Sequence, residues 1–153
     1  MEMTGEHRIA APRETVWQAL NDPEVLQVCI PGCEELSKTS DTEFEAVVVQ
    51  KIGPVKARFK GSVELINLNA PASYTIQGEG TGGVAGFAKG GADVRLDDDG
   101  GETILTYEVQ ANVGGKLARL GSRLIDSTAK KLAGKFFDSF QAHLNPEHIK
   151  ATD

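Results

Sequence analysis

The sequence predicts an α+β domain: a curved antiparallel sheet of six to seven strands wrapped around one long C-terminal helix, with two short helices after the first strand. Three observations predict it. Residues 112–144 repeat apolar side chains every three or four positions, which is the period of a helix with one apolar face. Residues 36–111 mostly alternate apolar and polar side chains, which is the period of strands with one buried face. Turn residues divide this region at hairpin spacing, so successive strands are expected to pair as a meander.

The N-terminal elements precede this change of period. Residues 3–9 are expected to form the first strand. Pro12 sits where a short helix could begin, and Val16, Trp17 and Leu20 give that helix an apolar side. Residues 23–28 are expected to form a second helical turn before a corner at residues 30–32. The remaining strands are predicted at residues 36–39, 43–49, 55–65, 74–80, 88–96 and 105–111.

The C-terminal helix is predicted to run unbroken from Asn112 to Leu144, and Pro146 follows where a helix stop is expected. Its apolar stripe is wide enough to dock onto a core. An antiparallel sheet with one apolar face needs a cover, and this helix is the only large cover that the sequence offers. The stripe comprises Leu117, Leu120, Leu124, Thr128, Leu132, Phe136, Phe140 and Leu144, with Ile125, Ala129, Ala133 and Phe137 on one flank.

Length and composition indicate one soluble domain. The chain has 153 residues, 40% hydrophobic and 25% charged, which is ordinary for a globular protein. We expect a single domain over residues 1–145 and a short polar tail over residues 146–153. No apolar run approaches the roughly 18 residues of a membrane span, and the N-terminus does not resemble a signal peptide. The expected location is therefore the cytoplasm.

The charge is unevenly distributed. The net charge is −6, yet residues 112–143 contain six basic and two acidic residues. Four of the basic residues have spacings of three, four and seven, which would place them on one face of the predicted helix: Lys116, Arg119, Arg123 and Lys130. Two interpretations stay open. The face is simply solvated, or it contacts an acidic protein or the anionic inner surface of the cytoplasmic membrane.

Several short motifs carry no function on their own. Residues 78–83 match G-x-G-x-x-G, but the segment that follows has strand period and glycine, so no helix N-terminus is predicted there to hold a phosphate. Cys29 and Cys33 have neither redox nor metal-site spacing, and we expect inert small side chains beneath a corner. The three histidines are scattered and are expected to be solvated, so no metal site is predicted.

Glycine is placed unusually in the predicted strands. Four glycines fall on the apolar parity of their strands: Gly61, Gly78, Gly80 and Gly90. Glycine inside a strand costs stability and fills no space. Two explanations stay open. Either the helix backbone approaches the sheet closely there, or the sheet leaves an apolar space for a small molecule.

The inward positions assigned in these strands also lack catalytic groups. They contain no Asp, Glu, His, Lys or Ser, and only Tyr74 and Tyr107 bring a polar atom to that face. General acid–base catalysis needs a titratable group within reach of the substrate, so no catalytic residue and no cofactor are predicted. Nucleic-acid binding is not expected either, because the strands are acidic overall and few aromatic residues interleave with the basic ones.

Several longer motifs are specific enough to be compared with known families. They are Cys-Ile-Pro-Gly-Cys-Glu at residues 29–34, Gly-Pro-Val-Lys at 53–56, Phe-Lys-Gly at 59–61, Gly-Phe-Ala at 86–88, Leu-Thr-Tyr at 105–107, Gly-Gly-Lys-Leu-Ala at 114–118 and Leu-Gly-Ser-Arg-Leu-Ile at 120–125. Together they closely resemble the family of the G subunit of carbon monoxide dehydrogenase. The resemblance extends over about residues 3–144. It implies a helix-grip domain of the START and polyketide-cyclase-like superfamily, which holds a hydrophobic ligand between its sheet and its long helix.

The resemblance also implies a function without recognised catalytic residues. Members of this family are associated with bringing a molybdenum hydroxylase, such as carbon monoxide dehydrogenase, to the cytoplasmic membrane, and a role in carrying quinone has been proposed for them. We therefore expect a non-catalytic accessory protein whose partners are a quinone or lipid and the subunits of such a hydroxylase. The alternatives are a cyclase-like or hydrolase-like enzyme that uses the same space, and an assembly factor without a ligand. The expected lining comprises Phe59, Gly61, Val63, Tyr74, Ile76, Gly78, Gly80, Val94, Tyr107, Leu117, Gly121, Leu124 and Thr128.

Overall fold

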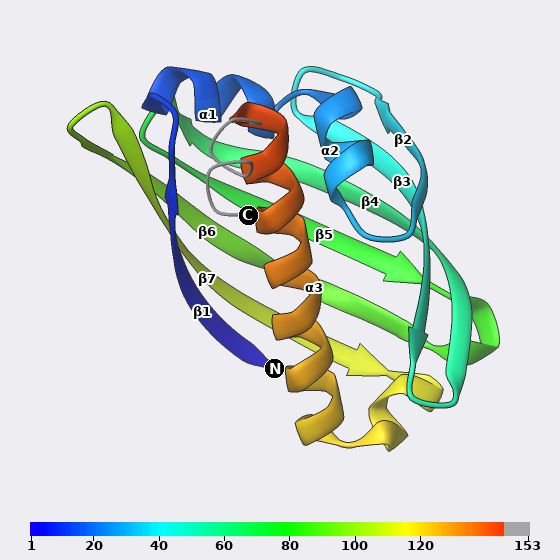
Figure 1. The fold of residues 1–153 in the computed structure, drawn as a ribbon. Coiled ribbons are helices and arrows are strands. Elements are labelled where there is room, and N and C mark those ends of the chain that lie inside the picture. The colour runs from blue at the N-terminus through cyan, green and yellow to red at the C-terminus, as the bar shows by residue number, and fades with distance from the viewer. Residues whose placement is uncertain (146–153) are drawn as a thin grey trace.

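The computed structural model describes residues 1–145 and has the predicted α+β architecture, a seven-stranded sheet with α3 lying across one face (Figure 1). The predicted polar tail at residues 146–153 lies outside the described residues. In chain order the elements are β1 (Glu2–Ile9), α1 (Arg13–Leu20), α2 (Pro23–Cys29), β2 (Cys33–Lys38), β3 (Glu43–Ile52), β4 (Val55–Asn69), β5 (Ser73–Thr81), the 3₁₀ turn η1 (Gly83–Ala85), β6 (Phe87–Asp99), β7 (Glu102–Gly114), the 3₁₀ helix η2 (Gly115–Leu120) and α3 (Ser122–Leu144).

The sheet is an antiparallel meander of β2 to β7, and β1 is added beside β7 as an edge strand. Its order is β1-β7-β6-β5-β4-β3-β2, so every pair except β1 and β7 joins strands that follow one another in the chain. The register places the inward glycines opposite one another: Gly61 pairs with Gly80, and Gly78 pairs with Gly90. The predicted parity of these residues is therefore confirmed, and the glycines form a patch across three neighbouring strands.

The buried core fills only one end of the space between sheet and helix. Ile9, Leu65, Leu96 and Leu105 are buried there, and Phe140 of α3 is fully buried among them. The short helices α1 and α2 close this end with Val16, Leu20, Val25 and Cys29. Asp22 helps to start α2, because its side chain accepts a hydrogen bond from the backbone N–H of Glu24. Of the two cysteines expected beneath a corner, Cys29 is buried in this core, whereas Cys33 is half-buried at the start of β2.

The C-terminal helix is shorter than predicted. Residues 112–114 still belong to β7, and residues 115–120 form η2. Gly115 (φ 72°) and Gly121 (φ 90°) adopt positive φ values that a right-handed helix does not use, so each breaks the helical path. The apolar spacing continues through η2, which is why periodicity alone merged it with α3.

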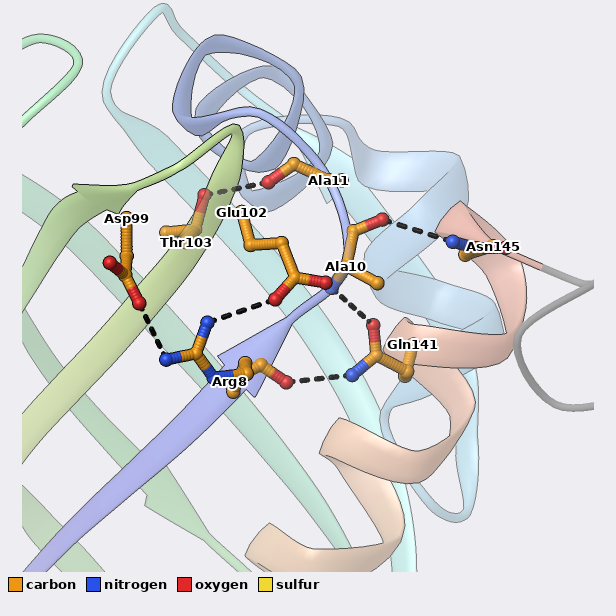
Figure 2. Close-up of polar contacts among 8 residues, drawn as sticks. All are labelled: Arg8, Ala10, Ala11, Asp99, Glu102, Thr103, Gln141 and Asn145. Atoms are coloured by element: carbon orange, nitrogen blue, oxygen red, sulfur yellow. Dashed lines mark hydrogen bonds and ion pairs between the residues drawn. The ribbon is translucent and has the colours of Figure 1, made fainter. Parts of the chain in front are cut away.

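Polar contacts fix the C-terminal end of α3 to the end of β1 (Figure 2). The backbone N–H of Ala10 donates to Oε1 of Gln141 (2.9 Å), and Nε2 of Gln141 donates to the carbonyl oxygen of Arg8 (2.8 Å). Nδ2 of Asn145 donates to the carbonyl oxygen of Ala10 (3.1 Å). The helix is therefore anchored firmly at the end where the core is complete.

Candidate functional site

The burial of the inward-facing residues decreases along five strands of the sheet. In β1, β4, β5, β6 and β7 the inward residues near α1 are buried, and those further along the same face are only half-buried. In β7, for example, Leu105 is buried, whereas Val109 and Ala111 are half-buried. The facing residues of α3 follow the same rule, since Phe140 is fully buried while Ile125, Ala129, Leu132 and Ala133 are half-buried. The inner face of the sheet and the facing side of α3 therefore form two apolar walls that do not bury each other completely.

The glycine patch shows that the helix does not fill this space. A Cβ atom built on Gly80 would meet only two atoms within 4 Å, the carbonyl oxygen of Lys60 at 3.6 Å and the Cα of Gly61 at 3.8 Å. The three nearest neighbours of a Cβ on Gly61 belong to Glu79 and Gly80, both in β5. No atom of α3 is among them. At Gly80, open space is therefore favoured over close packing of the helix backbone, whereas a Cβ on Gly90 would come 2.1 Å from the carbonyl oxygen of Gln110 in β7.

The helix rests on its flanks above this space. On one flank, Leu124 lies against the turn between β3 and β4, with its Cδ2 3.0 Å from a Cβ built on Gly53. On the other flank, Phe137 stacks on His7 of β1 with ring centroids 3.9 Å apart. A Cβ built on Gly134, one turn before Phe137, would meet nothing within 4 Å. We use the name inner hollow for the half-buried region between these supports, with Gly61, Gly78, Gly80 and Gly90 on the sheet and Ile125, Ala129 and Leu132 on α3.

The predicted lining residues divide among three places. Nine of them are half-buried in β4, β5, β7 and α3: Phe59, Gly61, Val63, Ile76, Gly78, Gly80, Tyr107, Leu124 and Thr128. Tyr74 and Val94 are buried in the core, where the Tyr74 ring meets Trp17 edge-on with centroids 5.3 Å apart. Leu117 is buried in η2, and Gly121 is exposed in the link to α3.

His7 is not solvated as the sequence predicted. It lies on the inner face of β1, stacked on Phe137 and 6.0 Å from the Tyr107 ring, with interplanar angles of 20° and 10°. The prediction was wrong although the sequence carried a signal, because Glu6 and Arg8 alternate with His7 and Ile9 and so place His7 on the apolar parity of β1. Burial lowers the pKa of His7, and the negative charge of Asp138 partly opposes this. The inner face therefore does carry one neutral, titratable imidazole.

Tyr107 lies beside His7 because Gly5 leaves room for its ring. Gly5 and Tyr107 are register partners, and a Cβ on Gly5 would come within 2.4 Å of the Tyr107 hydroxyl oxygen. Burial raises the pKa of Tyr107, so the hydroxyl stays protonated near neutral pH. Within residues 1–145, neither this hydroxyl nor a ring nitrogen of His7 has a hydrogen-bond partner.

The four predicted contact residues do not share one helix face, because Lys116 and Arg119 belong to η2 and only Arg123 and Lys130 belong to α3. Three segments nevertheless meet here: Gly53 approaches Leu124, Gly82 approaches Ala57, and Gly86 approaches Gly115. We call residues 51–56, 82–87 and 114–124 the basic end, which contains five exposed basic residues and no acidic one. Val84 and Phe87 project from it and are 85% and 50% exposed.

Other features of residues 1–145 give less support for a functional site. Residues 78–83 are the end of β5 and its turn into η1, so a G-x-G-x-x-G helix start is absent there. Burial raises the pKa of the Cys29 and Cys33 thiols, which disfavours the reactive thiolate. Depressions of about 870, 840 and 830 Å³ lie on the outer face of the sheet and are lined largely by its polar residues. No helix within residues 1–145 has an apolar stretch long enough to cross a bilayer.

Comparison with known proteins identifies the family. Residues 5–145 match the family model that describes the G subunit of carbon monoxide dehydrogenase (CoxG). The chain belongs to the CoxG family. A conserved protein from Geobacillus kaustophilus has 30% identity and a TM-score of 0.89, with 95% of this chain and 96% of that one covered. No functionally curated protein matches the sequence.

More distant structures place this CoxG-family chain in a wider fold. A START superfamily protein from Mycobacterium smegmatis has a TM-score of 0.71 at 12% identity, covering 95% of this chain and 97% of that one. A STAR-related lipid transfer protein fragment from Xanthomonas axonopodis has a TM-score of 0.63 at 20% identity, covering 94% and 85%. The helix-grip, START-like fold expected from the sequence is therefore confirmed.

Proposed function

We propose that this CoxG-family protein is a non-catalytic carrier that holds an uncharged apolar molecule, such as a quinone or the tail of a lipid, in the inner hollow. One observation carries the proposal: two apolar walls face each other half-buried, and no atom of α3 lies within 4 Å of a Cβ built on Gly80 between them. Apolar surface left in contact with water is unfavourable, so a ligand that covers it gains binding free energy. The fold shared with a STAR-related lipid transfer protein supports this use of the space.

Gly80→Leu tests the proposal by filling the inner hollow from its floor. The Cβ makes only ordinary contacts at this position, so the added side chain extends into the space rather than into the backbone. We expect equilibrium dialysis to show that 2,3-dimethyl-1,4-naphthoquinone binds the wild-type protein and binds Gly80→Leu at least about tenfold more weakly. Ser62→Leu places the same side chain on the exposed outer face of β4 and should bind as the wild type does. Equal binding by both variants would contradict the proposal.

The partner that we propose is a molybdenum hydroxylase of the carbon monoxide dehydrogenase type, and family membership is the support for it. Affinity capture with the hydroxylase of the same organism tests this, using wild-type protein and Gly80→Leu as baits. Capture by both baits, with quinone bound only by the wild type, would support a carrier that docks independently of its ligand. A wild-type protein that captures the hydroxylase but binds no quinone or lipid would instead support a ligand-free assembly factor.

An enzyme that uses the same space is the second candidate, and His7 is the observation that favours it. A neutral imidazole on an apolar face can act as a general base. Mass spectrometry of the bound molecule separates the two candidates. A ligand recovered unchanged after long incubation supports the carrier, whereas a new product that His7→Phe no longer forms supports the enzyme.

A peripheral contact with an anionic membrane surface is proposed for the basic end. Its five exposed basic residues and the projecting Val84 and Phe87 combine the charge and the apolar groups that such a surface attracts. A carrier of apolar cargo would collect its ligand from that surface.

A further inference from the structure

The side chains of His7 and Tyr107 are two polar groups that stand side by side on the inner face. His7 belongs to β1 and Tyr107 to β7, and both point to the side on which α3 lies. They form one group with Phe137 of α3, because the three ring planes lie within 20° of one another and the centroids are 3.9, 5.8 and 6.0 Å apart. This aromatic group stands where the closed core gives way to the inner hollow.

The polar atoms of this group lack partners in the part of the chain that the structure describes. Neither a His7 ring nitrogen nor the Tyr107 hydroxyl takes part in a hydrogen bond there. These polar atoms also keep some contact with solvent, since within residues 1–145 the one side-chain nitrogen or oxygen that is both buried and without a hydrogen-bond partner is Nε of Arg13. A hydrogen-bonding group at the rim of an apolar space discriminates strongly between ligands, because it must be matched when water leaves.

The charges around the group determine which ligand atom it would accept. His7 is held neutral by burial, and the group that faces it from α3 is the carboxylate of Asp138. A ligand carboxylate or phosphate placed here would be repelled by the negative charge of Asp138. A neutral acceptor such as a ketone oxygen instead matches the N–H of a neutral imidazole and the phenolic O–H of Tyr107. The nearly parallel rings also suit a flat conjugated ligand.

We propose that His7 and Tyr107 form the polar recognition point of the inner hollow and bind the ketone oxygen of an uncharged, flat ring system, as in a quinone. This inference rests on the proposed function and assigns residues that determine its specificity. Phe137 is a positioning residue in this arrangement, because it holds the imidazole by stacking and has no polar atom of its own. Gly5 is a second positioning element, since a side chain there would displace Tyr107.

A pair of matched probes tests the proposal by equilibrium dialysis at pH 7.5. The first is 2,3-dimethyl-1,4-naphthoquinone, whose substituted ring cannot alkylate the half-buried Cys33 at an open position. The second is 2,3-dimethylnaphthalene, which has the same shape without ketone oxygens. His7→Phe keeps an aromatic ring for stacking, and Tyr107→Phe removes only the hydroxyl. Each variant should weaken quinone binding by about 3- to 10-fold, the effect of one neutral hydrogen bond, and leave naphthalene binding unchanged.

The controls separate this inference from the proposed function. His143→Phe makes the same exchange at an exposed position of α3 and should bind both probes as the wild type does. Urea unfolding of each variant verifies that it is folded. If wild-type protein binds neither probe, the proposed function fails and the inference fails with it. If wild type binds both probes but the two variants weaken both equally, or neither, only the polar recognition point is overturned.

Discussion

Gln141 is the side chain that ties α3 to the edge strand of the sheet. It accepts from the N–H of Ala10 and donates to the carbonyl of Arg8, so one amide serves a donor and an acceptor where β1 ends (Figure 2). Nearby, the fully buried Thr103 donates its hydroxyl to the carbonyl of Ala11 at 2.8 Å. These three hydrogen bonds, two from Gln141 and one from Thr103, set the position of the chain as it leaves the sheet for α1.

Replacing Gln141 with Leu should destabilise the protein by about 1–3 kcal/mol. The volume is similar, but two hydrogen bonds are lost and the Ala10 N–H, which is partly buried, is left without its partner. Urea denaturation measures the free energy of unfolding. Gln18→Leu, an exposed position on α1, is the matched control and should change it by less than about 0.5 kcal/mol. Similar losses in both variants would contradict this role.

His7 should make the stability of the ligand-free protein depend on pH. Its pKa in the folded state is lowered below the unfolded value of about 6.5, so the unfolded chain binds more protons in the window below that value. The stability present above pH 6.5 should therefore decline as the pH falls through the folded pKa. In His7→Phe this part of the decline should disappear. If the unfolding free energies of the wild type and His7→Phe change with pH in the same way, His7 does not titrate this way.

The two halves of α3 have different tasks. Its C-terminal half carries Phe136, Phe137 and Phe140, whose rings pack on one another and on His7. Its N-terminal half carries small or half-buried side chains and touches the turn between β3 and β4 through Leu124. The C-terminal half of α3 completes the core, and the N-terminal half covers the inner hollow.

Gly134 marks the boundary between these halves, and Gly134→Ala should stabilise the fold by about 0.5–1 kcal/mol. Glycine within a helix costs about this much relative to alanine, and an added Cβ would meet no atom within 4 Å. Thermal or urea unfolding measures the gain. Gly90→Ala makes the opposite case, because its Cβ would come 2.1 Å from the carbonyl oxygen of Gln110, and it should destabilise. A loss of stability in Gly134→Ala would mean that this position is not open.

Across the whole molecule, the two ends of the antiparallel sheet differ in charge. Alternate connections of an antiparallel sheet lie at the same end, so the turns after β3, β5 and β7 meet at the basic end (Figure 1). The turns after β2 and β6 lie at the other end, and Asp41, Asp97, Asp98, Asp99 and Glu102 are in or next to them, with Arg8 forming ion pairs to Asp99 and Glu102. A protein with a net charge of −6 thus has an end that an anionic surface attracts and another that it repels.

Vesicles that contain about 30% phosphatidylglycerol in phosphatidylcholine should bind the protein through the basic end. The double reversal Arg119→Glu and Arg123→Glu should weaken binding at least about 30-fold, since each basic residue near such a surface contributes about 1 kcal/mol. Co-sedimentation at low salt measures the bound fraction, which should fall as salt is raised.

Lys131→Glu with Lys135→Glu is the matched control for this experiment. It makes the same change in net charge at exposed positions of α3 outside the basic end. It should retain most of the binding. If both double variants lose binding equally, net charge rather than the basic end is responsible.

Periodicity and turn residues were sufficient to predict the architecture. Strict alternation in β4 to β7 specified which side chains face the helix, and the register confirmed it. Patterning failed where local chemistry does not fix direction. In η2 the apolar spacing of a helix continued, although Gly115 and Gly121 turn the backbone away. In β1 the alternation does place His7 on the parity of Ile9, but the polar residue type favoured a solvated position, and the stacking on Phe137 comes from a distant element.

The sequence by itself determined that a sheet with an apolar, glycine-rich face is covered by a C-terminal helix, because side-chain period and parity are local properties of the chain. Only the tertiary structure decided whether those glycines meet the helix, since that depends on how high α3 rests on its supports at Gly53 and His7. It alone brought His7, Tyr107 and Phe137 together from three elements. Proximity between residues 7, 107 and 137 is set by strand order and helix placement, which the local sequence pattern does not encode.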